Sequence, residues 1–390
     1  MIDDYGSVGR LMNNSDIKTA RDLIYLVSCA VNEKTPEREI CEKIDLEQVY
    51  YLSSAHFLTS AVAFALEKVT VLPHPYDQAK KKAIRKLALF DIERAKLFAE
   101  LEKNGIWYLP LKGILLKNDY PISAMREMSD NDILCDSSGM GKIKEIMERM
   151  GYSCDVFGTT NHDTYSKPPT LEFEIHRELF LQSDMPEIFD YFKNIREKLL
   201  PIAGTSFGYR MTDEDFYIYL ICHAFKHYYF SGTGLRSLLD IYIYLSKHGE
   251  KLDRAYLDRE FEVLGLLGFE REITGVAQKA FGFEKLSDDE WKALFEYIES
   301  GVYGTEETRR YKRNNRNLGG DDSDGSKRRY LLKRVFISGK ALESNYPFFY
   351  KHKWLYPVLF VYRPVKGLFT HPKGIIKEYR EIKEFKTKRR

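Results

Sequence analysis

Three short segments that favour β-strands lie in the middle of a chain whose remaining pattern is mostly helical. They span residues 106–111, 125–135 and 170–176, and residues 152–157 follow the same pattern. Apolar residues in these segments are consecutive or alternate, as in buried and half-buried strands. Strands and helices in this order predict an α+β fold, in which a small mixed sheet is flanked by N- and C-terminal helical regions.

Helices are predicted on both sides of the strands because apolar residues recur there at helical spacing. The expected helices span residues 17–31, 45–64, 76–104, 139–150, 213–227, 233–247, 256–281 and 287–298. Gly105 is expected to end the third of them, since glycine is common just past a helix C-terminus. Residues 158–169 are polar and contain prolines, which favours a loop or the end of a hairpin.

With 390 residues, the chain is too long for one ordinary core, so more than one domain is expected. The patterns divide it into five parts. The parts are an N-terminal helical region at 1–105, an α+β core at 106–200, a helical domain at 201–318, a linker at 319–326 and a basic, aromatic segment at 327–390. The linker is rich in glycine and aspartate, which is typical of flexible connections.

The composition excludes several classes of protein. The five cysteines are odd in number and form no C-x-x-C pair, which argues against a disulfide framework and against a Cys-rich zinc site. The N-terminal residues are acidic and lack the pattern of a signal peptide. No apolar run reaches the roughly 20 residues that a spanning helix needs. We therefore expect no transmembrane segment and a cytoplasmic location.

The predicted strands carry three carboxylates in a pattern that suits a metal site. Asp130 and Asp132 are two residues apart, so on a strand they point to the same side. Glu174 lies on the last strand, where Leu171, Phe173 and Ile175 would take the opposite face. Carboxylates held together repel one another unless a cation lies between them, and hard oxygen ligands suit magnesium. Two such ions beside a phosphate would stabilise both the entering and the leaving oxygen.

The segment between the first two strands supplies candidates for phosphate binding. Lys112 and Gly113 follow a strand and precede a helical turn, where glycine permits close approach and a helix start offers free N–H groups. Lys112 and Arg126 could neutralise a triphosphate, with Ser129 beside the acids. Each feature alone has an ordinary explanation, such as a solvated turn for Asp-x-Asp or an exposed face for Glu-x-His. Their joint order at strand positions favours nucleotidyl transfer.

These motifs resemble a known family. The order Leu-Lys-Gly, Tyr-Pro, Arg-x-x-Ser-Asp-x-Asp-Ile-Leu, Gly-Tyr and Glu-Ile-His is similar to the bacterial uncharacterised nucleotidyltransferase family of the DNA polymerase β-like superfamily. The resemblance covers roughly residues 45 to 300. It implies magnesium-dependent transfer of a nucleoside monophosphate from an NTP, with ATP the first choice. By resemblance, Asp130 and Asp132 stand for the paired acidic ligands and Glu174 for the third.

The chain departs from the superfamily pattern at three points. Lys112-Gly113 stands where Gly-Ser or Gly-Gly is more usual, the gap from Gly113 to Asp130 is longer, and Asn131 lies where an apolar residue is usual between the acids. These departures concern the phosphate-binding turn more than the carboxylates. His176 could contact phosphate or orient Glu174.

A second set of candidates lies downstream. His223 and His227 are one helical turn apart, and Ala224 excludes the His-Glu motif of a metalloprotease. They are either histidines at the edge of the core with satisfied hydrogen bonds, which is slightly favoured, or part of the acceptor side of the cleft together with Arg236 and Asp240. Arg236 and Asp240 are spaced i, i+4 and could pair with each other.

The C-terminal segment differs sharply in charge from the rest. Residues 327–390 carry a net charge of +14 and the remainder −12. Basic residues mixed with aromatics suit an anionic membrane surface or nucleic acid. The simplest alternative, ranked first, is a helical extension packed on the acidic remainder.

The sequence thus predicts a magnesium-dependent nucleotidyltransferase with two metal ions and an unidentified hydroxyl-bearing acceptor. Two alternatives remain at this stage. One is a catalytically inactive protein of the same fold that acts as a binding or scaffold module. The other is a toxin-type transferase that modifies tRNA or protein.

Overall fold

The computed structural model describes residues 14–301, together with residues 355 and 359. Residues 14–301 belong to one compact unit. The predicted linker at 319–326 and nearly all of the basic segment at 327–390 lie outside the described residues, so the expectations for them stay predictions. No helix among the described residues is long and apolar enough to cross a membrane.

The N-terminal region is helical, as predicted. Its helices are α1 (Asn14–Val31), α2 (Arg38–Cys41), α3 (Leu46–Ala55), α4 (Thr59–Leu66) and α5 (His74–Lys103). The prediction of a single helix over residues 45–64 is wrong, because the helical conformation is interrupted between α3 and α4. Phe57 has a positive φ of 54° there, a conformation that interrupts a right-handed helix. Gly105 has a φ of 68° just past α5, as expected for a helix end.

The centre of the unit is a five-stranded mixed sheet, which confirms the predicted α+β fold. Its strands are β1 (Tyr108–Pro110), β2 (Asn131–Cys135), β3 (Ser153–Val156), β4 (His162–Lys167) and β5 (Leu171–His176), in the order β1-β2-β5-β4-β3. The pair β2 and β5 is parallel, and the other neighbours are antiparallel. Between the strands lie α6 (Gly113–Leu116), the 3₁₀ turns η1 (Ser123–Met125) and η2 (Ser137–Gly139), and α7 (Met140–Arg149).

Two predictions about the sheet are wrong. The loop expected at residues 158–169 contains β4, which pairs with β3 on one side and β5 on the other. Its residues are mostly polar because only alternate side chains, such as Tyr165, enter the core. The strand expected over residues 125–135 begins only at Asn131, since Met125 ends the 3₁₀ turn η1 and residues 126–130 form no regular structure.

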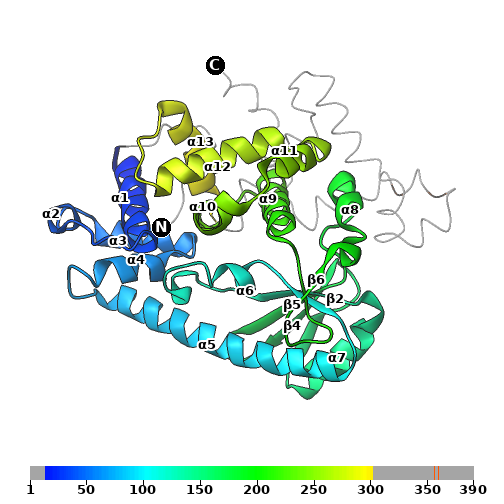
Figure 1. Cartoon of the computed structure of the whole chain (residues 1–390). Helices are drawn as coiled ribbons and strands as arrows, with labels where there is room; N and C mark the ends of the chain where they lie inside the picture. The colour runs from blue at the N-terminus through cyan, green and yellow to red at the C-terminus, as the bar shows by residue number, and fades with distance from the viewer. Residues whose placement is uncertain (1–13, 302–354, 356–358, 360–390) are drawn as a thin grey trace. The chain divides into compact units, whose positions relative to one another are not determined.

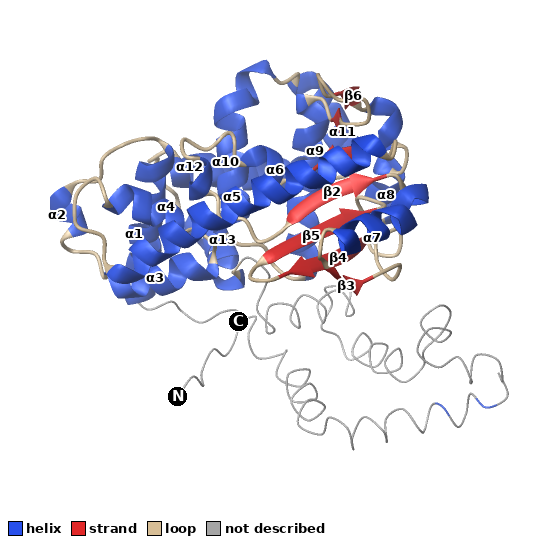
Figure 2. Ribbon diagram, turned by 90° about the horizontal axis from the view of Figure 1, so that it is seen from below, coloured by secondary structure: helices blue, strands red, loops and turns tan. Residues whose placement is uncertain are grey.

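One face of the sheet packs on α5 and α7. Figure 2 shows both helices lying across the strands, and Figure 1 shows the helices after the sheet on the other side. Ile133, Phe173 and Ile175 form a buried cluster with Phe90 and Leu97 of α5. This packing fixes which way each strand faces, and it leaves the alternate side chains of β2 and β5 pointing toward the helices on the other side.

The chain after β5 is helical apart from a short hairpin. Its elements are α8 (Pro186–Phe192), η3 (Ile195–Lys198), β6 (Leu200–Pro201), β7 (Tyr209–Arg210), α9 (Asp213–Phe230), α10 (Leu235–His248), η4 (Gly249–Lys251), α11 (Arg254–Val263), α12 (Leu267–Phe281) and α13 (Asp288–Ser300). The single helix expected at 256–281 is divided at Gly265, which has a φ of 66°. Ser287 and Glu290 form a capping box on α13.

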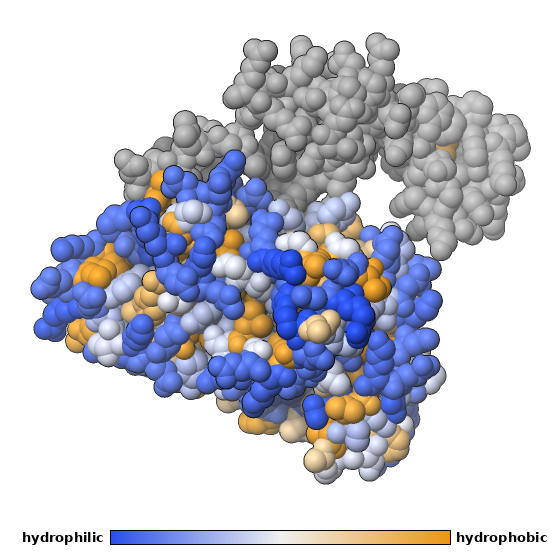
Figure 3. Space-filling model, turned by 45° about the horizontal axis from the view of Figure 1, so that its top comes forward, coloured by the Kyte–Doolittle hydropathy of each residue, from blue (hydrophilic) through white to orange (hydrophobic). Residues whose placement is uncertain are grey.

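The N-terminal and C-terminal helices share one hydrophobic core. Leu23 and Val27 of α1 belong to the same buried cluster as Leu239 of α10 and Ile273 of α12. The boundaries of the predicted domains stay predictions. On the face shown in Figure 3, hydrophilic residues predominate, and apolar residues form separate groups.

His56 joins three of these helices where α3 ends. The ring is fully buried, its Nδ1 accepts from the backbone N–H of Leu235 at 3.2 Å, and its Nε2 lies 3.1 Å from the carbonyl oxygen of Ile298. This arrangement assigns the proton to Nε2 and requires a neutral ring. Burial lowers the pKa of His56 to about 4.

We expect this histidine to make the protein acid-sensitive. Because the folded pKa lies below the unfolded value, the unfolded state binds more protons between pH 6.5 and pH 4. The free energy of unfolding should therefore fall by about 3 kcal/mol as pH decreases through this range. Urea unfolding at several pH values measures the slope, which should be shallower in His56→Gln. The exposed His74→Gln variant supplies the reference, and an unchanged slope in His56→Gln would contradict the assignment.

Candidate active site

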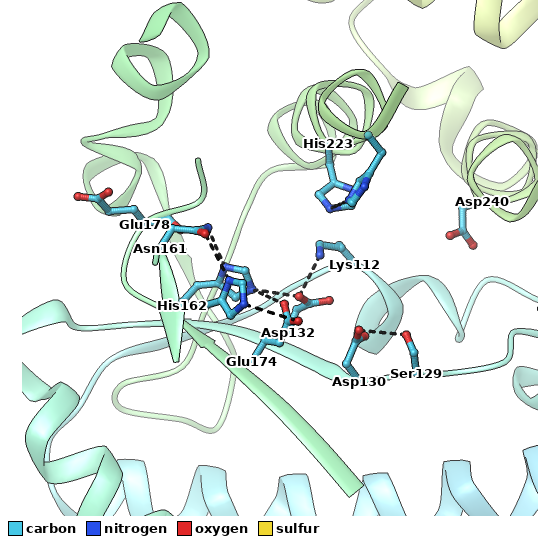
Figure 4. A network of polar contacts seen from close by, with 12 residues as sticks. Lys112, Ser129, Asp130, Asp132, Asn161, His162, Glu174, Glu178, His223 and Asp240 are labelled. Carbon is cyan, nitrogen blue, oxygen red and sulfur yellow. Dashed lines mark hydrogen bonds and ion pairs between the residues drawn. The ribbon is translucent and has the colours of Figure 1, made fainter. Parts of the chain in front are cut away.

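The pairing of β2 with β5 brings two of the predicted acids together. Asp132 lies directly opposite Glu174 in the parallel register, and His176 lies two residues further along β5. These side chains share the face of the sheet that points away from α5 and α7. We call this surface the acid face, defined by Asp132, Glu174, His176 and, on β4, His162. Figure 4 shows Asp132 and Glu174 side by side.

Asp130 lies just before β2, on the same side of the sheet. It accepts a hydrogen bond from Ser129 Oγ at 3.0 Å. Figure 4 shows both residues to the right of Asp132. Burial and the negative charge of Asp132 raise the pKa of Asp130. Two neighbouring carboxylates that repel each other in this way are the arrangement that a bound cation relieves.

Asp132 is neutralised by two donors. Lys112 Nζ lies 2.9 Å and His176 Nε2 lies 3.0 Å from the same oxygen, Oδ1. Burial raises the pKa of Asp132, but the charge of Lys112 and the hydrogen bond from His176 outweigh it and hold the pKa well below its usual value. Burial lowers the pKa of Lys112, but the charges of Asp132 and the other acids raise it by more, so the pKa is higher than its usual value. The pair is therefore fully charged.

The backbone at Lys112 is unusual. Its φ is 37° and its ψ −113°, a region that residues with a Cβ rarely occupy. The conformation turns the chain from β1 into α6, with Lys112 Nζ on Asp132. Strained backbone of this kind persists where surrounding contacts enforce it, and it is concentrated at functional sites.

Gly113 is required here by packing against a side chain. A Cβ at this position would lie 2.3 Å from Arg126 Nη1 and 2.7 Å from Met128 Sδ. The expected reason, close approach to a phosphate, stays a prediction. Since α6 has only four residues, its N-terminus adds little to that argument.

Arg126 forms a buried ion pair that the sequence did not predict. Its Nε and Nη2 donate to the two oxygens of Asp240 on α10, each at 2.8 Å, and Tyr120 donates to Asp240 at 2.7 Å. The suggested pairing of Asp240 with Arg236 is wrong. Arg236 instead donates to the carbonyl oxygen of Glu127 at 3.2 Å. Substrate roles for Arg126 and Arg236 stay predictions, and Arg126 already links the sheet to the helices.

His223 and His227 lie on α9, opposite the acid face. Their Nε2 atoms are 3.1 Å apart, so one ring donates to the other. Figure 4 shows His223 across from Lys112. Burial lowers the pKa of both rings, that of His227 to about 3, and the nearby charge of Lys112 acts in the same direction. The pair is therefore neutral, and the two histidines satisfy each other, as the first alternative predicted. A role on the acceptor side of the cleft stays a prediction.

Sequence reasoning missed two groups beside this site. His162 of β4 lies opposite His176 in the register, with its Nε2 3.7 Å from Glu174 Oε1. Lys226 of α9 is half-buried, and burial and the charge of Lys112 lower its pKa. His162 was missed because its strand was read as a loop. The signal available in the sequence was the single large aromatic residue Tyr165 among the polar residues of 162–167, which is compatible with a strand that buries one face.

Comparison with known proteins identifies the family. A family model described as uncharacterised nucleotidyltransferase matches residues 42–282, which is more than half of the chain. The protein belongs to this family. No curated protein and no solved structure matches the chain. The match supports nucleotidyl transfer in general, and a bacterial source and the polymerase β-like superfamily stay predictions.

Within this nucleotidyltransferase, the departure at Asn131 has a structural explanation. Asn131 is fully buried on the opposite face from Asp132, and its Oδ1 accepts from Arg94 Nη1 of α5 at 2.8 Å. Arg94 also pairs with Asp91, which binds Lys117 beyond α6. The polar residue between the acids therefore joins β2 to α5 by a hydrogen bond, which an apolar residue at this position could not form.

We expect the Arg126–Asp240 pair to be a structural requirement of the site. Asp240→Asn leaves the buried guanidinium without its counter-charge and should lower the free energy of unfolding by about 3–5 kcal/mol. Denaturant unfolding followed by circular dichroism measures this loss. The control is Asp190→Asn, which removes an exposed pair with Lys193 and should cost less than about 1 kcal/mol. Equal costs for the two variants would leave Arg126 free for substrate.

Proposed function

We propose that the protein transfers a nucleoside monophosphate from an NTP to a hydroxyl group on an unidentified acceptor. ATP is the first candidate for the NTP. The observation that carries this proposal is the register of β2 and β5, which opposes Asp132 and Glu174. Asp130 stands beside them, within reach of their charges. Three carboxylates on the same side of the sheet would suit the handling of a polyphosphate with divalent cations.

The donor set fits magnesium. Asp130, Asp132 and Glu174 offer only carboxylate oxygens, which are the ligands magnesium prefers, and a site with few protein ligands leaves positions for phosphate and water. These three residues would hold two ions. Bound magnesium would supply positive charge to the phosphate oxygens during transfer.

Lys112 and α9 supply the remaining positive charge. Lys112 is paired with Asp132 in this structure, and an ion on Asp132 would release it toward the phosphates. Lys226 and the neutral pair His223 and His227 face the same space and offer further hydrogen-bond donors. Phosphoryl-group transfer depends chiefly on such positioning and charge stabilisation.

The chemistry requires one proton acceptor. The acceptor oxygen attacks the α-phosphorus, the bond from this phosphorus to the bridging oxygen breaks, and pyrophosphate leaves. The hydroxyl proton goes to Glu174 or to an adjacent group. Burial raises the pKa of Glu174, but the contact with His176 and the charges of Lys112 and His162 together outweigh this effect and lower the pKa overall. Glu174 is therefore ionised at neutral pH and able to take a proton.

Removal of the paired acids tests the function. The double variant Asp130→Asn, Asp132→Asn keeps the shape of both side chains, and it should lose magnesium-dependent NTP binding and at least about 100-fold of transfer activity. Binding is measured by calorimetry with each of the four NTPs. Transfer is measured with radiolabelled NTP on cell lysate, separated into RNA, protein and small-molecule fractions.

Two exposed carboxylates provide the matched control. Glu145 of α7 and Asp155 of β3 are changed together to Gln and Asn, which alters the net charge by the same amount. This control should bind NTP as the parent does. If the Asp130 and Asp132 variant also binds NTP and magnesium normally, the assignment is wrong. If the parent binds no nucleotide at millimolar concentration, the inactive scaffold is the better description.

A further inference from the structure

A second group of possible metal ligands lies at the β5–β4 side of the acid face. His162, Glu174 and His176 each offer one ligand atom, and these atoms all lie within 4.8 Å of one another. His162 Nε2 is 3.7 Å from Glu174 Oε1, and His176 Nε2 is 3.6 Å from Glu174 Oε2. The two rings face each other with their centres 5.0 Å apart. This group differs from the three acids because two of its donors are imidazole nitrogens.

The side chain of Asn161 determines what His162 presents to Glu174. Its Nδ2 donates to the carbonyl oxygen of Glu178 at 3.1 Å, which orients the amide. Asn161 Oδ1 then lies 3.3 Å from Nδ1 of His162 and accepts its proton. A neutral ring that donates through Nδ1 has a free lone pair on Nε2. Support of this kind, from a hydrogen-bond acceptor behind the ring, is what metal-binding histidines almost always have.

His162 Nε2 and Glu174 Oε1 therefore face each other as two acceptors. Neither atom can donate to the other, and a cation between them would satisfy both. His176 is in a different state, because its Nε2 donates to Asp132 Oδ1 at 3.0 Å. The Nδ1 of His176 also accepts from Asn161 Nδ2 at 3.4 Å. His176 therefore joins the group as a ligand only when its proton moves from Nε2 to Nδ1 and Asn161 Nδ2 moves away from that atom, whereas His162 needs no change.

We propose that His162, Glu174 and His176 bind a divalent transition-metal ion in preference to magnesium. Imidazole nitrogen is a good ligand for zinc, cobalt, nickel and iron, whereas magnesium prefers oxygen. The two ions of the proposed transfer centre would then differ in kind. The ion near Asp130 is held by oxygen, and the ion near Glu174 by nitrogen and oxygen. The catalytic role of this second ion rests on the proposed function, but its binding does not.

Cobalt is the probe, because its visible absorption changes when protein ligands replace the water around the ion. The full chain is freed of metal with a chelator and titrated with Co²⁺ or Mg²⁺ in the absence of nucleotide. We expect Co²⁺ to bind at least about tenfold more tightly than Mg²⁺. Zn²⁺ should displace it. Equal affinity for Co²⁺ and Mg²⁺, or no Co²⁺ binding, would overturn the proposal.

Variants identify the ligands. His162→Phe should weaken Co²⁺ binding by at least about tenfold and leave weak Mg²⁺ binding unchanged. The control is His248→Phe, since His248 resembles His162 in exposure, 27% against 26%, and also faces a carboxylate, Asp119 at 3.1 Å. Circular dichroism checks folding, and His162→Ala serves if the first variant does not fold. Unchanged Co²⁺ binding in a folded His162 variant refutes the ligand set.

Two further outcomes are distinguishable. His223 and His227 form the other close pair of histidines described above, so His227→Phe is tested as well. Loss of Co²⁺ binding in that variant, with no loss in His162→Phe, would move the ion to α9 and overturn the proposal. Intact Co²⁺ binding without any nucleotidyl transfer would reject the proposed function and leave the metal site standing.

Discussion

The site depends on the neutralisation of Asp132 in a buried position. A carboxylate there is costly unless it is paired, and both Lys112 and His176 bind the same oxygen. The lysine reaches it from a strained turn, and the histidine reaches it from the neighbouring parallel strand. A single charge thus holds β1, β2 and β5 in one arrangement. Any cation that binds Asp132 must compete with these partners, so metal binding and the position of Lys112 are coupled.

A second buried pair joins this sheet to the helices that cover it. Arg126 and Asp240 are both nearly inaccessible to solvent, and Tyr120 completes the hydrogen bonding of the carboxylate. Because Gly113 leaves room for the guanidinium, the turn that carries Lys112 and the ion pair are packed against each other. The unusual Lys-Gly sequence is therefore explained by structure before any ligand is considered. Because Asp240 lies on α10, the same contact joins that helix to the turn.

The fold could be predicted where the sequence pattern is strong. The long helix α5 and the strands β2 and β5 follow from apolar spacing, and the positions of Asp132 and Glu174 on one face follow from alternation. Strand β4 was missed because His162, Thr164 and Ser166 are polar, and only two of its side chains are fully buried. Its identity as a strand comes from pairing on both sides, which is a tertiary property. Without that strand, the sequence gives no reason to place His162 beside Glu174.

The sequence by itself determined the family, the α+β architecture and the acidic residues, since these depend on local spacing and residue type. Only the tertiary structure decided the partners. Arg126 binds Asp240, 114 positions away, and His176 binds Asp132, 44 positions away. Such contacts join elements distant in sequence, and no periodic pattern encodes which of several possible charges will meet. The physical reason is that pairing is selected by burial, which exists only once the helices close over the sheet.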